Sequence, residues 1–347
     1  MKFTKSTIIA AATLTALAFA GCTKKPAEKT AEVTAETTEK TTAEKTYKIG
    51  IAKIVQHVAL DSVEKGVMDE LNEKGIKATF DLQNANGDPN TAAQIAIKYR
   101  DENVDVAVGI ATPVAIALAN TLDEIPVVFG TITDPLGAGL VSTLEHGEKN
   151  VTGMSDAIPT EQHIALFKEI AGIKTLGYIY TTGEANSVSS LELVKKGCQE
   201  AGLELVTQAI TNSSEVKQAC DAIVSRVDGL YLTTDNTVFS ALSSVKQVFG
   251  EAKKPIFSGD VTGAQDGGCV IASGFNYYKA GRATGEIVYR ILNGEKPSDI
   301  PVRFMTEPSD SDLLFDLDSA KNCGITIPEE YLSKANMIFE NGKLTTK

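Results

Sequence analysis

From residue 47 onward, short apolar runs alternate with segments in which apolar residues recur at helical spacing. Residues 47–52 and 126–130 are apolar runs of strand length, and the second is typical of a strand buried on both faces. After the first run, an apolar residue returns every three or four positions from Leu60 to Leu71, which predicts one face of a helix. Strands and helices that alternate in this way predict parallel β-α-β units.

Helix boundaries are marked by residues that usually begin and end helices. Asp88 precedes Pro89, and Thr112 precedes Pro113. A capping side chain followed by proline predicts the start of a helix. Gly75 stands where the first helix should end, because glycine readily adopts the left-handed conformation that follows a helix C-terminus.

The same rhythm resumes in the second half of the chain. We predict helices over residues 160–171, 186–201, 214–227, 236–249 and 277–292, and strands over 175–180, 203–210, 228–232, 255–257 and 270–273. Two half-chains of the same pattern predict an α/β protein with two doubly wound parallel-sheet lobes joined by a hinge. No repeat of solenoid length is present in the sequence, which excludes a solenoid.

The N-terminus predicts export and lipidation. Residues 1–21 have a basic start followed by an apolar stretch that is too short to span a bilayer, which is typical of a signal peptide. Small residues precede Cys22, as in the lipobox of bacterial lipoproteins, so we predict that Cys22 is acylated; the alternative is an ordinary signal peptide with an incidental cysteine. Residues 22–46 are rich in Thr, Lys and Glu and are predicted to form a disordered tether.

Composition narrows the possible functions. The formal net charge of the 347 residues is −12, and so acidic a surface disfavours nucleic-acid binding. The chain has three histidines, of which His57 follows the first strand while His146 and His163 are predicted to lie at the surface. Neither a nucleophile elbow, a metalloprotease helix nor a phosphate-binding loop is present in the sequence. We therefore predict no catalytic residues, no metal and no cofactor.

Four cysteines follow Cys22: Cys198, Cys220, Cys269 and Cys323. Export would permit disulfides, but the sequence does not choose among the possible pairings. Cys220 falls on an apolar helix stripe, so buried free thiols are the favoured interpretation.

Polar residues follow the predicted strands of both halves, where open α/β sheets bind their ligands. The candidate binding residues are Gln56, His57, Thr112, Thr131, Asp134, Asp156, Asn186, Ser187, Thr234, Asp235, Asn236 and Asp260. A helix N-terminus such as that at Thr112 favours an anion, and an aspartate favours an ammonium group. Together they predict a site for a small zwitterion between the lobes. The alternative at several single positions is that the side chain only caps its helix.

Several of these residues belong to motifs of a known family. The motifs are Gln56-His57-x-Ala-Leu-Asp61, Gly109-x-Ala-Thr-Pro113, Gly153-x-Ser-Asp156, Glu184-x-Asn-Ser187, Thr234-Asp-Asn236 and Gly281-x-x-Thr-Gly285. In this order, over residues 48–339, the chain resembles the ABC-transporter substrate-binding lipoproteins of the tryptophan/tyrosine type, which have the type I periplasmic-binding fold.

The resemblance implies a monomeric clamp that closes on an aromatic amino acid and delivers it to an ABC permease, at the periplasmic or extracellular face of a membrane. It implies three crossovers between lobes, with residues 47–156 and about 274–302 in lobe one, and 157–273 and about 303–347 in lobe two. It further implies that Thr112 and Thr131 bind the ligand carboxylate and that Asp235 or Asp260 binds the ammonium group. The chain has no tryptophan, so the rings expected to stack on the ligand are those of His57, Phe129, Tyr180 or Phe275.

Other functions remain open from the sequence. The same fold also binds nucleosides, sugars and other amino acids. An exported α/β enzyme and a lipoprotein that presents an adhesion surface are alternatives from different classes.

Overall fold

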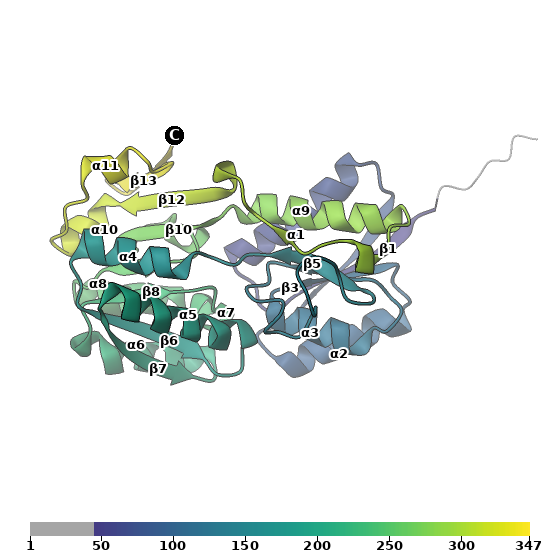
Figure 1. Ribbon diagram of the computed structural model, residues 1–347, viewed down its shortest axis with the longest axis horizontal. Coiled ribbons are helices and arrows are strands. Elements are labelled where there is room, and N and C mark those ends of the chain that lie inside the picture. Colours follow the sequence, from purple (N-terminus) through teal and green to yellow (C-terminus); the bar gives the residue numbers. More distant parts are fainter. Residues whose placement is uncertain (1–44) are drawn as a thin grey trace, which may run out of the picture. The chain divides into compact units, whose positions relative to one another are not determined.

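A computed structural model describes residues 45–347, which form two α/β lobes (Figure 1). The predicted signal peptide of residues 1–21, the acylation site Cys22 and nearly all of the predicted tether lie outside the described residues. Over residues 45–347, the helices are too short or too polar to cross a membrane.

Lobe one contains a sheet of six strands in the order β11-β5-β4-β3-β1-β2, and every pairing in it is parallel. Its strands are β1 (Tyr47–Lys53), β2 (Ala78–Asn84), β3 (Val106–Ile110), β4 (Val127–Gly130), β5 (Val151–Ser155) and β11 (Arg303–Phe304). Its helices are α1 (Val58–Glu73), α2 (Pro89–Asp101), α3 (Thr112–Thr121) and α9 (Tyr277–Leu292). As predicted, Asp88 caps α2, accepting a hydrogen bond from the Asn90 amide at 2.9 Å.

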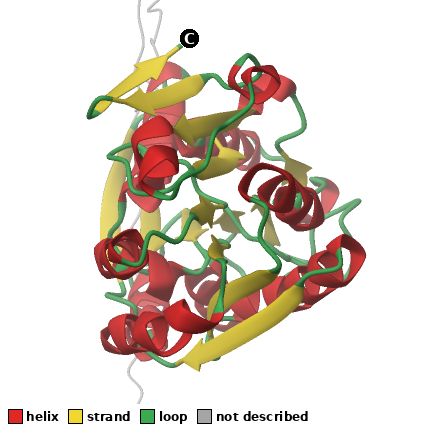
Figure 2. Cartoon of the chain, turned by 90° about the vertical axis from the view of Figure 1, so that its left-hand side faces the viewer, coloured by secondary structure: helices red, strands yellow, loops and turns green. Residues whose placement is uncertain are grey.

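Lobe two contains a sheet of eight strands in the order β14-β13-β12-β10-β9-β8-β6-β7. Its strands are β6 (Thr175–Thr181), β7 (Glu204–Ile210), β8 (Gly229–Leu232), β9 (Ile256–Ser258), β10 (Ile271–Phe275), β12 (Ser311–Asp316), β13 (Met337–Glu340) and β14 (Lys343–Thr346). Its helices are α4 (Thr160–Ala171), α5 (Ala185–Ala201), α6 (Val216–Ile223), α7 (Asn236–Ser240), α8 (Leu242–Glu251), α10 (Leu317–Asn322) and α11 (Glu329–Leu332). Helices lie on both sides of the strands in the view that faces this lobe (Figure 2).

The sheets match the predicted doubly wound pattern, with two differences. The helix predicted over 236–249 is interrupted at Ala241 and forms α7 and α8. The strands after residue 302, including β11, were not predicted. Of these, β12 runs antiparallel to β10, and β13 and β14 form an antiparallel pair of partly exposed strands, whose apolar pattern is weak for that reason.

The chain passes between the lobes after β5, β10 and β11. The last two passages lie slightly beyond the expected positions. β10 continues to Phe275 in the second sheet, and β11 pairs with β5 in the first sheet, so the segment in lobe one extends to Phe304 rather than residue 302. Pairing with a neighbouring strand decides each limit, and the local sequence does not encode that pairing.

The core of lobe two contains a histidine that was predicted to lie at the surface. His163 of α4 is 4% exposed, stacks on Phe257 with ring centroids 4.9 Å apart, and has its Nδ1 3.0 Å from the Tyr231 hydroxyl. Burial lowers the pKa of His163 to about 3, so the ring is uncharged at neutral pH. The cysteines Cys198, Cys220, Cys269 and Cys323 are free, and the first three are buried as expected, while Cys323 is only partly buried.

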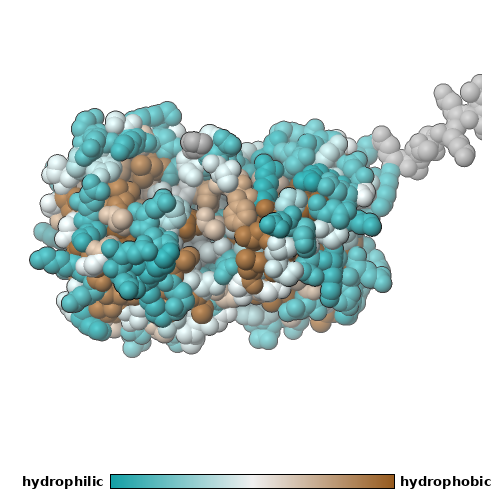
Figure 3. All heavy atoms as spheres, viewed as in Figure 1, coloured by the Kyte–Doolittle hydropathy of each residue, from teal (hydrophilic) through white to brown (hydrophobic). Residues whose placement is uncertain are grey.

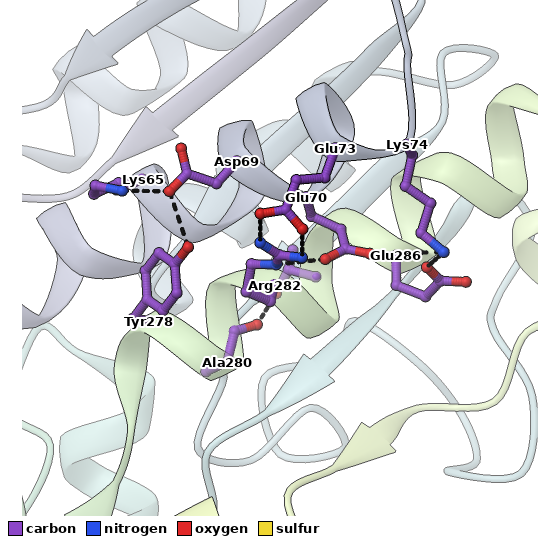
Figure 4. Close-up of polar contacts among 10 residues, drawn as sticks. Lys65, Asp69, Glu70, Glu73, Lys74, Tyr278, Ala280, Arg282 and Glu286 are labelled. Carbon is purple, nitrogen blue, oxygen red and sulfur yellow. Dashed lines mark hydrogen bonds and ion pairs between the residues drawn. The ribbon is translucent and has the colours of Figure 1, made fainter.

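Helices α1 and α9, which are about two hundred residues apart in sequence, pack closely in lobe one. Gly66, Gly281 and Gly285 lie at the contact, and a Cβ on Gly281 would stand 2.2 Å from the carbonyl oxygen of Val63. Charged side chains border this contact (Figure 4): Arg282 donates hydrogen bonds to Glu70 and Glu73, and Lys74 pairs with Glu286. The close approach holds α1, whose N-terminus lies beside the site described next.

Candidate functional site

A cavity lies between the carboxyl ends of the two sheets. Lobe one and the adjoining segments contribute His57, Leu60, Ala111, Thr112, Thr131, Thr133, Asp156 and Tyr277, and lobe two contributes Asn186, Thr234, Asp235, Asn236, Phe239 and Asp260. Apolar residues gather in the furrow between the lobes, and hydrophilic residues dominate the surfaces on either side (Figure 3).

The structure brings together most of the predicted binding residues, but not all of them. Gln56 is exposed and lies outside the cavity lining. Asp134 accepts a hydrogen bond from the Gly137 amide at 2.8 Å in a neighbouring loop and lines a different pocket. Ser187 lies behind the cavity wall, where its hydroxyl donates to Asp235 at 2.5 Å. The structure therefore leaves these three side chains off the lining of the cavity.

The ends of β3 and β4 carry backbone strain at the cavity wall. Ala111 has a φ of 74° and Thr131 has a φ of 57°. Residues other than glycine rarely adopt positive φ values, and these values are least favourable for a β-branched residue such as threonine. Such conformations concentrate at functional sites, where the surrounding structure enforces them. Here they accompany the turn from β3 into α3, whose first residue, Thr112, is buried at the cavity. The free N–H groups of this helix end favour an anion.

Asp235 lines the cavity, but its carboxylate already has four hydrogen bonds. Its Oδ2 accepts from the Thr181 amide at 2.8 Å and from Ser187, while its Oδ1 accepts from the Thr181 hydroxyl at 2.8 Å and from the Val238 amide at 2.9 Å. Four bonds fill the acceptor capacity of a carboxylate. Asp235 therefore fixes β6 and caps α7, which argues against the expectation that it binds the ammonium group.

Asp156 and Asp260 retain capacity to accept hydrogen bonds. Asp156 has two long contacts, from the Thr133 hydroxyl at 3.3 Å and the Tyr277 hydroxyl at 3.4 Å. Asp260 accepts from the amide and hydroxyl of Thr262, both through Oδ1 and both at 2.7 Å. Burial raises the pKa of Asp156 to about 6 and also raises the pKa of Asp260, because the charged forms lose their hydration.

The cavity therefore favours a cationic group. Its lining includes three aspartates and neither lysine nor arginine. Burial lowers the pKa of His57, although nearby Asp260 opposes this effect, so the ring adds little positive charge at neutral pH. Within residues 45–347, no group of three or more His, Cys, Asp or Glu side chains is arranged to hold a metal ion.

Of the four rings expected to stack on the ligand, His57 lines the cavity and the other three do not. His57 faces Phe239 across the lobes, with ring centroids 6.3 Å apart and an interplanar angle of 31°. Phe129 is fully buried in the core and Tyr180 stacks on Tyr178. Phe275 also lies outside the cavity lining.

Five lining residues were not among the predicted set: Leu60, Ala111, Thr133, Phe239 and Tyr277. Thr133 had a local signal, because it follows β4, and Leu60 and Ala111 lie within the family motifs given above. Phe239 reaches the cavity from the second turn of α7, and Tyr277 from the start of α9 after a passage between lobes. No local pattern distinguishes either ring from a core residue.

A direct hydrogen bond joins the two lobes at the cavity. The hydroxyls of Thr133 in lobe one and Thr234 in lobe two are 2.8 Å apart. The ends of β4 and β8 are thus held together across the cleft, which is the arrangement of a closed clamp.

Replacing Thr234 with valine is expected to weaken ligand binding about 3- to 10-fold, because it removes a hydrogen bond that requires the lobes to be closed. The loss should appear mainly as faster dissociation, measured by stopped-flow fluorescence or surface plasmon resonance. Thr182→Val, which changes an exposed threonine of the same lobe, is the control and should leave dissociation unchanged. An unaltered dissociation rate in Thr234→Val would show that this contact does not hold the closed form.

Two α/β lobes that close over a buried polar cavity define a small-molecule binding protein of the type I periplasmic-binding fold. Residues 48–338 match the model of the ABC transporter substrate binding protein family. The chain belongs to this family, whose members deliver substrates to ABC transporters from outside the cytoplasm.

Relatives support this assignment. A protein of Clostridioides difficile named tyrosine-binding protein is 35% identical over 270 residues, covering 76% of this chain and 78% of that protein. The structure of a Streptococcus pneumonia ABC domain in complex with L-Trp is 33% identical, with a TM-score of 0.81 over 85% of this chain and 100% of that one. The ligand-free, open structure of a Clostridium difficile substrate-binding protein with adhesive properties is 36% identical, with a TM-score of 0.62 over 82% of this chain and 96% of that one.

The conformation of the lobes follows from this comparison. The two solved relatives have similar identity to the chain, yet the L-Trp complex superimposes better than the open, ligand-free structure. Together with the Thr133–Thr234 hydrogen bond, this indicates that the lobes are closed.

Proposed function

We propose that this protein binds an aromatic amino acid, with L-tryptophan and L-tyrosine as the leading candidates, and presents it to an ABC importer. The observation that carries the proposal is a closed cavity lined by carboxylates, without lysine or arginine, and by the N-terminus of helix α3. The L-Trp complex and the tyrosine-binding relative agree with that chemistry.

In this proposal each part of the ligand has a matching group. The carboxylate binds the N-terminus of α3, together with Thr112 and Thr131. The ammonium group binds the open carboxylate oxygens of Asp156 and Asp260. The ring occupies the apolar part of the cavity beside His57 and Phe239, whose faces permit stacking.

The test is a binding screen on protein that has been unfolded and refolded to remove any ligand carried through purification. Thermal shift followed by calorimetry would compare the twenty amino acids, nucleosides and common sugars. A ligand at about 100 times its Kd stabilises the folded state by about 2.7 kcal/mol. We expect shifts with tryptophan or tyrosine; a shift confined to a sugar or nucleoside would retain the fold assignment and refute the ligand.

Ligand affinity is expected to fall about tenfold between pH 7 and pH 5. Burial raises the pKa of Asp156 to about 6, so only about one-tenth of this carboxyl is ionised at pH 5. A protonated Asp156 loses its charge attraction for the ammonium group. Calorimetry in a series of buffers checks the result, and Asp156→Asn should show a flatter profile; affinity that is independent of pH would contradict the assignment.

We further propose that Cys22 is acylated and that the following residues tether a monomeric clamp to the membrane. The support is the signal and lipobox pattern of residues 1–22. Labelling with a clickable palmitate analogue in a bacterial host tests it. Incorporation should disappear in Cys22→Ser and persist in Cys198→Ser, and labelling that persists in Cys22→Ser would refute the anchor.

A further inference from the structure

One buried polar atom at the cavity lacks a hydrogen-bond partner. Asn186 is 2% exposed and lines the cavity, and its Oδ1 is the only buried side-chain nitrogen or oxygen within residues 45–347 that is left unpaired. An unpaired buried acceptor costs free energy, and such an atom in a native structure needs an explanation.

The orientation of the Asn186 amide is fixed by its neighbours. Its Nδ2 donates to the Glu184 carboxylate at 3.1 Å and to the backbone carbonyl of Thr234 at 2.9 Å. The reverse orientation would place the amide oxygen against two acceptors, which is unfavourable. Asn186 therefore presents only its oxygen to any further partner.

Glu184 is itself held in place, so the orientation does not depend on a mobile side chain. It is buried, and its two oxygens accept hydrogen bonds from the backbone and side chains of Asn236 and Thr237 at the start of α7. The Asn186 oxygen is thus a preorganised acceptor in the wall of lobe two.

We propose that the Asn186 oxygen accepts a hydrogen bond from a donor on the ring of the ligand, and that it makes the site selective for aromatic amino acids with a phenolic O–H or an indole N–H over phenylalanine. This inference rests on the proposed function. It names the part of the ligand that Asn186 recognises.

The strand order separates this acceptor from the ammonium subsite. Asp260 follows β9, whereas Asn186 follows β6, and β8 lies between these strands. The ends of β6 and β9 are therefore separated by two spacings between neighbouring strands, which is about 10 Å. An aromatic amino acid whose ammonium group lies at Asp260 is long enough to bring a donor on its ring to Asn186. A site built to bond a ring donor discriminates strongly against the analogue without it, because the buried acceptor then remains unpaired.

The test is calorimetry of wild type and Asn186→Leu with two matched ligand pairs: L-tyrosine with L-phenylalanine, and L-tryptophan with 1-methyl-L-tryptophan. In the wild type we expect the donor-bearing member of at least one pair to bind more tightly by about tenfold or more. In Asn186→Leu the ratio of the two affinities within that pair should fall to about threefold or less. Because each ratio compares two ligands on one protein, a general loss of stability does not alter it.

Thr234→Val is the matched control, since it changes the same cavity wall but should weaken both members of a pair equally. Equal losses for both members in Asn186→Leu, or no donor preference in the wild type, would overturn this inference while leaving the proposed function intact. Failure of every amino acid to bind the wild type would overturn both.

Discussion

Asp156→Asn is expected to lower the affinity for L-tryptophan or L-tyrosine by about 30- to 5,000-fold. Asparagine has nearly the same shape but no charge, so the ligand ammonium group would be buried with one carboxylate fewer. Loss of one partner from a buried charged hydrogen bond costs about 2–5 kcal/mol. Calorimetry on refolded protein measures the change directly.

The same substitution is expected to stabilise the ligand-free protein. The pKa of Asp156 is raised to about 6 in the folded state from an ordinary value of 3.8. The folded state therefore binds the proton more tightly, and its stability falls as the pH rises from about 4 to 6. Asparagine does not ionise, so we expect the free energy of unfolding at pH 7 to rise by about 1–3 kcal/mol, measured by urea denaturation.

Asp134→Asn is the matched control for both measurements. Asp134 also follows a strand of lobe one, but it lies outside the cavity, where it bonds the Gly137 amide. Its substitution should leave affinity unchanged. If Asp156→Asn also leaves affinity unchanged while Asp260→Asn abolishes binding, the ammonium group is bound by Asp260 alone.

Gly281→Ala is expected to destabilise the protein by about 2–3 kcal/mol and to weaken ligand binding. The added Cβ would stand 2.2 Å from the Val63 carbonyl oxygen and 2.8 Å from its Cα. Both are backbone atoms of α1, so the overlap can be relieved only by moving a helix, and overpacking of this kind typically costs 1–3 kcal/mol. Displacement of α1 would also shift His57 at its N-terminus.

Gly250→Ala is the control for this prediction. Gly250 also lies within a helix, α8, but the space around it is open. Alanine there should be neutral or raise stability by up to about 1 kcal/mol, because alanine has the higher helix propensity. Urea denaturation compares the two variants. Equal stability in both would show that α1 and α9 tolerate a wider separation.

The sequence by itself determined the two-lobed α/β fold and much of the binding chemistry. Hydrophobic periodicity is a local property, so the helices over residues 160–171 and 277–292 were predicted with the bounds that the structure has. Parallel strands present their carboxyl ends at one edge of a sheet. That rule alone placed Thr112, Asp156 and Asp260 among the candidate residues, and the structure brings them to one cavity.

Only the tertiary structure decided which polar groups remain free for a ligand. Asp235 and Asp260 both follow strands and look equivalent in sequence, yet Asp235 is saturated by residues from β6, α5 and α7 while Asp260 keeps an open oxygen. The same holds for the rings, because Phe239 reaches the cavity while Phe129 lies in the core. Hydrogen-bond saturation and burial arise from contacts between distant segments, and local sequence does not specify them.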